Sequence, residues 1–196
     1  MYAQLSSIID LVADEDADVA ALIAAENLRQ NETIPLIPSE NIVSDAVAAA
    51  LASCFTNKYA EGYPHKWKDG VAQEANGRYY QGQANTNQLE RLVIDRALKL
   101  FVGDKADQYH ANVQPLSGAP ANLAVLSAFL APGDTFMGLA LDNGGHLTHG
   151  HKVNITGKFF HAVQYGLTAE GLLDYETIEK SVFRSWNGSH SALFMC

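Results

Sequence analysis

One stretch restricts the possible folds more than any other, the ten residues LDNGGHLTHG from Leu141 to Gly150. The apolar run Thr135–Leu141 that leads into it predicts a buried β-strand, and the glycine pair Gly144 and Gly145 then breaks the strand. Adjacent glycines let a backbone turn sharply or approach a ligand closely. A histidine just after such a turn lies where open α/β sheets bind their ligands. The stretch therefore predicts an α/β fold with His146 beside a binding site.

Helices and strands alternate along the chain from Thr86 onward. The spacing of apolar residues predicts helices over 86–101, 120 or 121–130 and 174–183, and strands over 109–114, 135–141, 159–165 and 191–196. Such alternation is typical of an α/β layer with a largely parallel sheet. Because no crossover helix follows the last strand, we expect the front part of a larger fold, truncated within the sheet.

The N-terminal part of the chain is less regular. We expect helices over 14–30 and 46–55, with an extended segment over 33–41 because Pro35 and Pro38 exclude a helix there. Residues 57–83 are rich in glycine and tyrosine and predict a long loop with a functional role. We therefore expect an N-terminal region of arm, helices and loop over 1–85 and an incomplete large α/β domain over 86–196.

Charge and cysteine content narrow the class of protein. The formal net charge of -9 argues against a nucleic-acid partner, since phosphate binding needs a basic surface. No apolar run approaches the roughly 20 residues of a membrane span, and the N-terminus has no basic residue before its apolar stretch, as a secretory signal would. Two distant cysteines, Cys54 and Cys196, fit a reducing compartment. We expect a cytoplasmic protein without membrane or nucleic-acid partners.

Local chemistry suggests two ligand contacts. The turn Ser117-Gly118-Ala119 precedes a predicted helix, whose free N–H groups and dipole suit a phosphate, but the same residues also suit an ordinary strand-to-helix turn. His146 suits either a structural role or a ligand contact. A metal site on His146, His149 and His151 is an alternative, but the spacing matches no standard zinc pattern, so we predict no metal.

Three segments together resemble serine hydroxymethyltransferase: GGHLTHG within 141–150, NKYAEGYP over 57–64 and PSEN over 38–41. The resemblance runs from Ile34 to Cys196 and covers only the N-terminal portion of that family's chain. It implies a fold-type I pyridoxal-phosphate-dependent transferase, with an aminotransferase-like large domain and tetrahydrofolate as co-substrate. It also implies interconversion of serine and glycine in one-carbon metabolism. A homodimer with shared active sites is implied as well, with the N-terminal arm packed across the partner.

The resemblance assigns roles residue by residue. Ser117, Gly118 and Ala119 match the turn that holds the cofactor phosphate, and His146 matches the histidine that stacks on the cofactor ring. Glu61 matches the glutamate that contacts the substrate hydroxymethyl group and handles its proton. Tyr59 and Tyr80 match tyrosines that reach the neighbouring subunit's cofactor and substrate, and Ser39 matches a serine that binds the substrate carboxylate. Asn122 matches an asparagine that faces the pocket. The folate site is matched by Leu141, Gly145 and Leu147.

Simpler interpretations exist for several of these positions. The tyrosines also suit aromatic packing, Glu61 a solvated loop carboxylate, Ser39 a turn cap and Asn122 the first turn of a helix.

The sequence also departs from the family pattern. Ala119 stands where the family usually has a second serine, and residues 65–76 are extra in the loop that crosses the dimer. No lysine has the threonine-rich context of the one that bonds to the cofactor, since Lys58, Lys152 and Lys158 match other positions. We therefore expect this chain to be catalytically incomplete. The alternatives are a non-catalytic paralogue that acts as an interaction protein, or another fold-type I enzyme such as a threonine aldolase.

Overall fold

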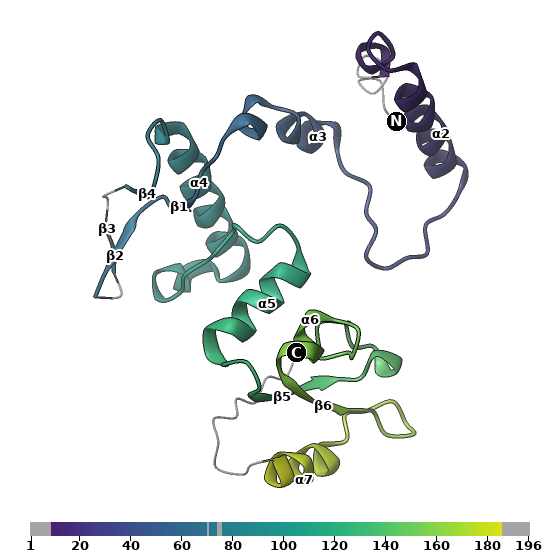
Figure 1. The fold of residues 1–196 in the computed structure, drawn as a ribbon, viewed down its shortest axis with the longest axis vertical. Helices are drawn as coiled ribbons and strands as arrows, with labels where there is room; N and C mark the ends of the chain where they lie inside the picture. The colour runs from purple at the N-terminus through teal and green to yellow at the C-terminus, as the bar shows by residue number, and fades with distance from the viewer. Residues whose placement is uncertain (1–8, 70, 74–75, 186–196) are drawn as a thin grey trace. The chain divides into compact units, whose positions relative to one another are not determined.

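The computed structural model describes residues 9–69, 71–73 and 76–185, which form a mixture of helix and sheet (Figure 1). The chain forms two compact units, residues 1–100 and 101–196, and each is described by itself. The helix α4, Ala84–Phe101, lies almost wholly in the first unit. The division at 85/86 expected from the sequence stays a prediction, since it concerns the domains of a larger fold. None of the helices in the described ranges combines the length and apolarity needed to cross a bilayer.

Two helices of the first unit lie near the predicted positions. Helix α2, Ala17–Glu32, starts after Asp16, whose carboxylate accepts hydrogen bonds from two first-turn N–H groups. Helix α3, Asp45–Leu51, is capped by Ser44 but ends four residues before the predicted limit at 55. A 3₁₀ turn η1, Cys54–Asn57, follows instead, after the N–H groups of Ala52 and Ser53 have closed the last turn of α3.

The prediction that residues 57–83 form a structureless loop is wrong. They contain four short strands, β1 Gly62–Tyr63, β2 Lys66–Lys68, β3 Val71–Gln73 and β4 Gly77–Arg78. β1 pairs with β4 and β2 with β3, both antiparallel, so the extra residues 65–76 lie largely in the β2–β3 hairpin. The pairing needs two glycines, because a Cβ on Gly62 would lie 2.4 Å from the Gly77 carbonyl oxygen and one on Gly77 2.3 Å from that of His65. Strands that depend on close backbone contact at glycines show no apolar periodicity in the sequence, so they could not be predicted from it.

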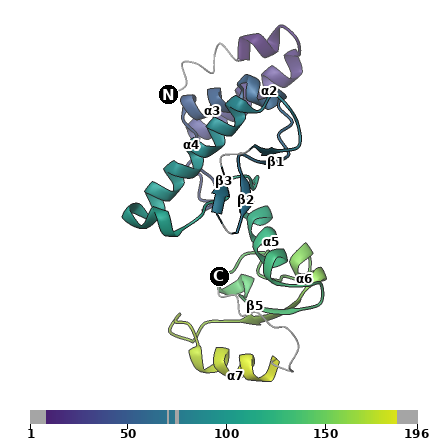
Figure 2. The same ribbon diagram turned by 90° about the vertical axis from the view of Figure 1, so that its left-hand side faces the viewer.

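Helix α4 lies beside β1 in two perpendicular views (Figure 1, Figure 2) and beside β4 in Figure 1. It begins at Ala84, two residues before the start predicted at Thr86. The residue before the helix is Gln83, whose carbonyl accepts the Asn87 N–H at 2.8 Å. Gln83 is buried because its side-chain amide also donates to the Tyr59 carbonyl at 2.8 Å. That bond joins the residue before the helix to the segment that precedes β1.

The second unit is a small α/β layer. Strands β5 Thr135–Leu139 and β6 His161–Tyr165 are parallel, with Met137 opposite Val163. Helix α5, Gly118–Phe129, precedes β5, a short helix α6, Ile155–Phe159, lies in the crossover, and α7, Tyr175–Ser185, follows β6. Neighbouring residues of β5 point to opposite faces of the sheet. Phe136 packs in one cluster with α5 residues and Met137 in another with Ile178 of α7, so α5 and α7 cover the two faces (Figure 1, Figure 2).

Other predictions for this unit need correction. Residues 109–114 are not a strand, because they follow the 3₁₀ segment η2, Gly103–Gln108, and pair with no strand in the described part of the chain. The strand predicted over 135–141 ends at Leu139, and the 3₁₀ turn η3, Leu141–Asn143, follows it. The helix α6 was not predicted, because five residues are too few to show a helical period. The strand predicted over 191–196 lies outside the described residues.

Candidate functional site

Glu61 lies at the entrance to β1, on a loop whose backbone is fixed on both sides. The Nη1 atom of Arg78 donates to the carbonyl oxygens of Ala60 and Gly62, each at 2.6 Å. The Tyr79 N–H donates to the Glu61 carbonyl at 3.2 Å. These bonds hold the backbone on both sides of Glu61 while its carboxylate remains exposed.

Arg78 is itself held from the other side by α4. Its Nε donates to the Asn87 side-chain oxygen at 2.9 Å, and its Nη2 forms an ion pair with Glu90. The side chain of Arg78 is 1% exposed and that of Glu90 is 13% exposed. A buried charge is tolerated only when it is paired and its donors are used, and Arg78 meets both conditions. We name the set of Arg78, Asn87 and Glu90 the arginine clamp.

Two tyrosines gather beside Glu61 in the same unit. The ring centroids of Tyr59 and Tyr80 are 5.1 Å apart at an interplanar angle of 74°, and the Tyr59 hydroxyl lies 3.4 Å from the Glu61 carboxylate. An edge-to-face pair of this kind is favourable. Both residues remain well exposed, at 66% and 48%. The structure thus brings Tyr59, Glu61 and Tyr80 together with a large part of each ring open to solvent.

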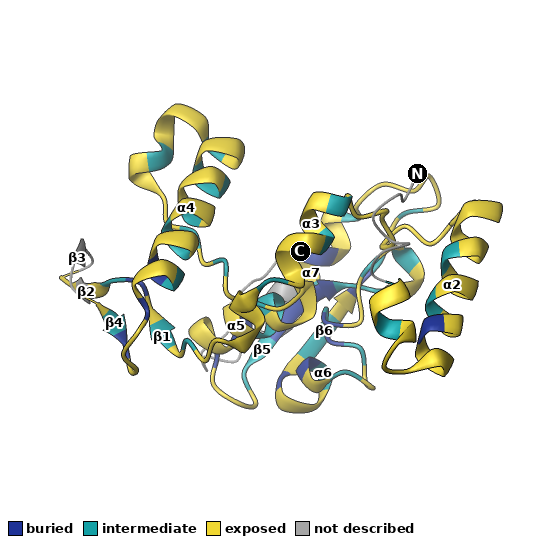
Figure 3. Ribbon diagram, turned by 90° about the horizontal axis from the view of Figure 1, so that it is seen from above, coloured by how far each residue is buried: buried dark blue, intermediate teal, exposed yellow. Residues whose placement is uncertain are grey.

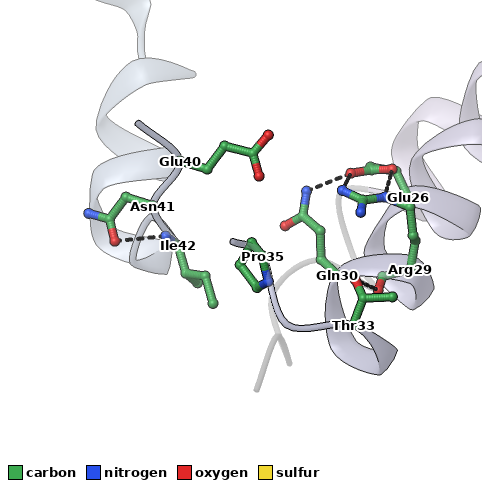
Figure 4. Close-up of a pocket in the computed structure, with 8 residues that line it drawn as sticks. All are labelled: Glu26, Arg29, Gln30, Thr33, Pro35, Glu40, Asn41 and Ile42. Atoms are coloured by element: carbon green, nitrogen blue, oxygen red, sulfur yellow. Dashed lines mark hydrogen bonds and ion pairs between the residues drawn. The ribbon is translucent and has the colours of Figure 1, made fainter. Parts of the chain in front are cut away.

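Ser39 lies in an exposed turn closed by the Glu40 N–H on the Ile37 carbonyl. A pocket of about 270 Å³ lies between the end of α2 and the segment that follows it, with Glu40 projecting toward Gln30 (Figure 4). The ion pair of Arg29 and Glu26 at 2.7 Å forms part of its wall. The side-chain hydrogen bonds from Arg29 and then Gln30 lower the Glu26 pKa to about 2.

The turn Ser117-Gly118-Ala119 is the start of α5. Ser117 is the N-cap residue, and Gly118 and Ala119 belong to the first helical turn rather than preceding it. The helix therefore begins earlier than the predicted Pro120 or Ala121. The Ser117 side chain makes no capping hydrogen bond, and all three residues are exposed. First-turn N–H groups have no partner within a helix, so this exposed start suits an anion.

His146 lies in the second unit beyond β5, on a loop that turns at two glycines. Gly144 has φ +95° and closes the η3 turn. A Cβ on Gly145 would lie 1.9 Å from the Leu139 carbonyl oxygen, so only glycine fits there. The Gly145 N–H donates to the Ala140 carbonyl at 3.0 Å. This close return of the backbone to the strand end places the following histidine beside the end of β5.

The His146 ring is exposed but anchored through one nitrogen. The Thr148 N–H donates to His146 Nδ1 at 3.2 Å, and Thr148 Oγ1 lies 2.8 Å from the same atom. Asn122 of α5 donates its side-chain N–H to Thr148 Oγ1 at 2.7 Å. Thr148 is 2% exposed. The structure therefore connects the predicted residues Asn122 and His146 through a threonine that sequence reasoning missed.

His149 supports the same loop. Its Nδ1 accepts the His146 N–H at 3.0 Å. Burial lowers the His149 pKa below its ordinary value, the nearby His146 lowers it further, and a hydrogen bond with the Leu139 backbone acts in the opposite direction. No group of three potential metal ligands gathers within the described ranges.

The remaining predicted residues border this loop. Leu141 begins η3, just beyond the strand, and Leu147 directly follows His146. Their side chains are 41% and 38% exposed. Leu141, Gly145, Leu147 and His146 therefore lie on one short loop, and α5 contributes Asn122 to it.

Sequence reasoning missed Arg78, Asn87, Glu90 and Thr148. Their contacts join residues from different elements, and local spacing does not record such contacts. Thr148 carried one weak signal, because a threonine two residues after a histidine can bond back to it.

Comparisons with known proteins agree with the motifs. A family model described as serine hydroxymethyltransferase matches residues 12–185. Curated relatives named serine hydroxymethyltransferase include one from Desulfotalea psychrophila, 52% identical over 84% of this chain and 35% of its own length. Others come from Paracidovorax citrulli, 52% identical over 86% of this chain and 37% of its own length, and Halorhodospira halophila, 49% identical over the same shares. The chain thus spans little more than a third of the length of these relatives.

Proposed function

The chain belongs to the serine hydroxymethyltransferase family, and we propose that it supplies one part of an active site that interconverts serine plus tetrahydrofolate and glycine plus 5,10-methylenetetrahydrofolate. The observation that carries this proposal is the family match across nearly all described residues. The fold class that goes with it is the large domain of a fold-type I pyridoxal-phosphate transferase. A cytoplasmic location stays a prediction from the sequence.

The residues present suit pyridoxal phosphate. Ser117 has a hydroxyl that no cap uses, and the exposed start of the twelve-residue α5 offers free N–H donors to a phosphate. His146 offers an exposed imidazole held at one nitrogen, which suits stacking on a flat ring. When bound, the cofactor supplies the electron sink for the reaction. Ala119 supplies no hydroxyl, so we expect a weaker phosphate contact than a second serine would give.

Glu61 is the proposed acid–base group. Its exposed carboxylate can take up or release the proton of the substrate hydroxyl, while the arginine clamp fixes the backbone that carries it. Tyr59 and Tyr80 each offer a rigid aromatic face and one hydroxyl at the same place. We propose that Ser39 contacts the substrate carboxylate, and that Leu141, Gly145 and Leu147 line the folate site with Asn122 behind them.

We further propose a homodimer in which the tyrosines serve the neighbouring subunit. Large apolar side chains of α4 are exposed in the single chain, among them Leu89, Leu92 and Val93 at 41 to 44% (Figure 3). Exposed apolar surface of this kind is typical of protein interfaces. Equilibrium sedimentation tests the association, and a monomer at micromolar concentration would contradict it.

Titration of the purified chain with pyridoxal phosphate, followed by absorbance, tests the cofactor proposal. Ser117→Ala should weaken binding roughly fivefold, the equivalent of one hydrogen bond. The change should leave the helix intact because the side chain is not used as a cap. Ser127→Ala, on an exposed position of α5, is the matched control. Absence of saturable binding, or equal effects of the two changes, would contradict the proposal.

Borohydride reduction in the presence of pyridoxal phosphate tests for the covalent lysine. We propose that none of the lysines in these 196 residues takes that role, because none has the sequence context of the family's lysine. Mass spectrometry should therefore find no stoichiometric adduct on a single lysine. One such adduct would show that a lysine of this chain bonds to the cofactor.

Folate dependence separates the alternatives. An activity on a hydroxyamino acid that ignores tetrahydrofolate would favour another fold-type I enzyme, such as a threonine aldolase. Dimerisation without any cofactor or folate binding would favour a non-catalytic interaction protein.

A further inference from the structure

The contacts around His146 Nδ1 restrict where the imidazole proton can lie. The nearby Thr148 N–H, at 3.2 Å, is a backbone group that can only donate. A ring nitrogen that accepts a hydrogen bond carries a lone pair rather than a proton. In the neutral ring the proton must then be on Nε2.

The Thr148 hydroxyl, like the Thr148 N–H, donates toward His146 Nδ1. The Asn122 side-chain N–H donates to Thr148 Oγ1 at 2.7 Å and so occupies a lone pair of that oxygen. Because Nδ1 already accepts from the Thr148 N–H it has no proton to donate, so the hydroxyl hydrogen points at His146 Nδ1, 2.8 Å away, rather than at Asn122. Donation therefore runs one way, from Asn122 to Thr148 and from Thr148 to His146. Thr148 is 2% exposed, so water has little access to its hydroxyl.

We propose that Thr148 is a positioning residue that fixes His146 in the tautomer with its proton on Nε2, with Asn122 setting the direction of the Thr148 hydroxyl. The imidazole then presents an N–H donor, rather than a bare nitrogen, to an acceptor oxygen of the ligand that lies near the imidazole plane, beside the stacked ring. This last step rests on the proposed cofactor contact. The tautomer itself depends only on residues of this chain.

His149 limits how far the ring can move. Its Nδ1 accepts the N–H of His146 at 3.0 Å, so the backbone of His146 is held by one imidazole while its side chain is held by Thr148. Asn122 and His149 both line a cavity of about 180 Å³ next to Thr148, whose other walls are largely apolar. A change at Thr148 therefore leaves the loop in place and alters mainly the hydrogen bonds of the ring.

Long-range ¹H–¹⁵N correlation spectra of the full chain, labelled in histidine and without cofactor, test the tautomer. The two ring nitrogens have distinct ¹⁵N shifts in the protonated and unprotonated state, and His146→Gln assigns the signals. We expect an unprotonated Nδ1 and a protonated Nε2. A protonated Nδ1 in the neutral ring would overturn the proposal.

Two substitutions test the role of Thr148. Thr148→Val removes the hydroxyl at nearly constant volume and should change the tautomer ratio roughly fivefold, the equivalent of one hydrogen bond, whereas Thr148→Ser should preserve it. Thr156→Val is the matched control, because Thr156 is also buried and its hydroxyl bonds to Asn154 rather than to a histidine. Equal ¹⁵N shifts in Thr148→Val and the wild type would mean that Thr148 only fills space.

Asn122→Asp tests the direction of donation without changing Thr148. A carboxylate accepts the Thr148 hydroxyl hydrogen and turns it away from His146, so the population with a protonated Nδ1 should rise. An unchanged ratio in this variant would overturn the role of Asn122. Addition of pyridoxal phosphate then separates the two proposals. If the tautomer is the expected one but the ¹⁵N shifts of His146 do not change when the cofactor is added, only the cofactor contact is overturned.

Discussion

Around Glu61 the backbone is held by a buried guanidinium, whereas the His146 loop is held by backbone amides, a threonine hydroxyl and an imidazole. Arg78 makes four side-chain contacts, one of them an ion pair with Glu90. The His146 loop depends on a glycine that returns to the strand end and on single hydrogen bonds through Thr148 and His149. Both loops present an exposed side chain from a fixed backbone.

The difference lies in what happens when a support is removed. A buried ion pair that loses one partner leaves an uncompensated charge, and the penalty is large. A neutral hydrogen bond contributes about 1 kcal/mol, so its loss is local. Loss of a support should therefore either unfold the Glu61 loop or leave it intact. The stability of the His146 loop should instead change in small steps with substitution and with pH.

The largest effect is expected from Arg78→Met. It should lower the free energy of unfolding of the first unit by roughly 3 to 5 kcal/mol, because the largely buried carboxylate of Glu90 loses its ion pair and the cavity left by the guanidinium is only partly refilled. Urea denaturation measures the loss, and Arg29→Met is the control because its ion pair with Glu26 is half-exposed. A loss below about 1 kcal/mol would remove the contrast between the loops. Pairing Arg78→Met with Glu90→Met should recover part of the loss.

A smaller effect is expected from Gly145→Ala. The added Cβ would lie 1.9 Å from the Leu139 carbonyl oxygen, so the loop must shift at a cost of roughly 1 to 3 kcal/mol. Gly118→Ala is the control, because a Cβ there meets nothing within 4 Å. Urea denaturation compares the two variants. Equal midpoints would show that the loop relaxes freely and is not fixed at this glycine.

A smaller effect again is expected on the pH dependence of the free energy of unfolding, through His149 of the His146 loop. The His149 pKa is lower in the folded chain than its ordinary 6.5, so the unfolded chain binds more protons between the two values. The stabilisation is fully present above pH 6.5 and is lost as the pH falls toward the folded pKa. The stability difference between wild type and His149→Gln should therefore shrink on acidification below 6.5. A difference that stays constant from pH 8 to 5 would contradict this.

The smallest effect is expected from Glu26→Gln. The lowered pKa of Glu26 comes from hydrogen bonds with Arg29 and Gln30 on an exposed helix surface. Exposed ion pairs contribute little because water and salt screen them. The urea midpoint at pH 7 should stay within experimental error. A clear loss would mean that charge outside the arginine clamp also supports the first unit.

The elements that carry apolar periodicity could be predicted from the sequence. α4, α5, β5, β6 and α7 were each expected within a few residues, because their apolar residues recur at the helical or strand period. The His146 loop was also expected, because a glycine pair after an apolar run has one simple structural meaning.

The supports of both loops could not be predicted, since they join residues far apart in the chain. The partners of Arg78 lie 9, 12, 16 and 18 positions away, and Asn122 lies 26 positions from Thr148. No local pattern encodes such pairs. The site residues themselves were suggested by family motifs, and their roles stay predictions until ligand binding is measured.

The pairing of β1 with β4 has a consequence for how this chain can be changed. The two strands close the base of the β2–β3 hairpin, and the arginine clamp holds that base to α4. Residues can therefore be added to or removed from the far end of the hairpin without altering the spacing between Glu61 and Tyr80. An epitope or a fluorescent label could therefore be attached at the hairpin with little effect on the residues around Glu61.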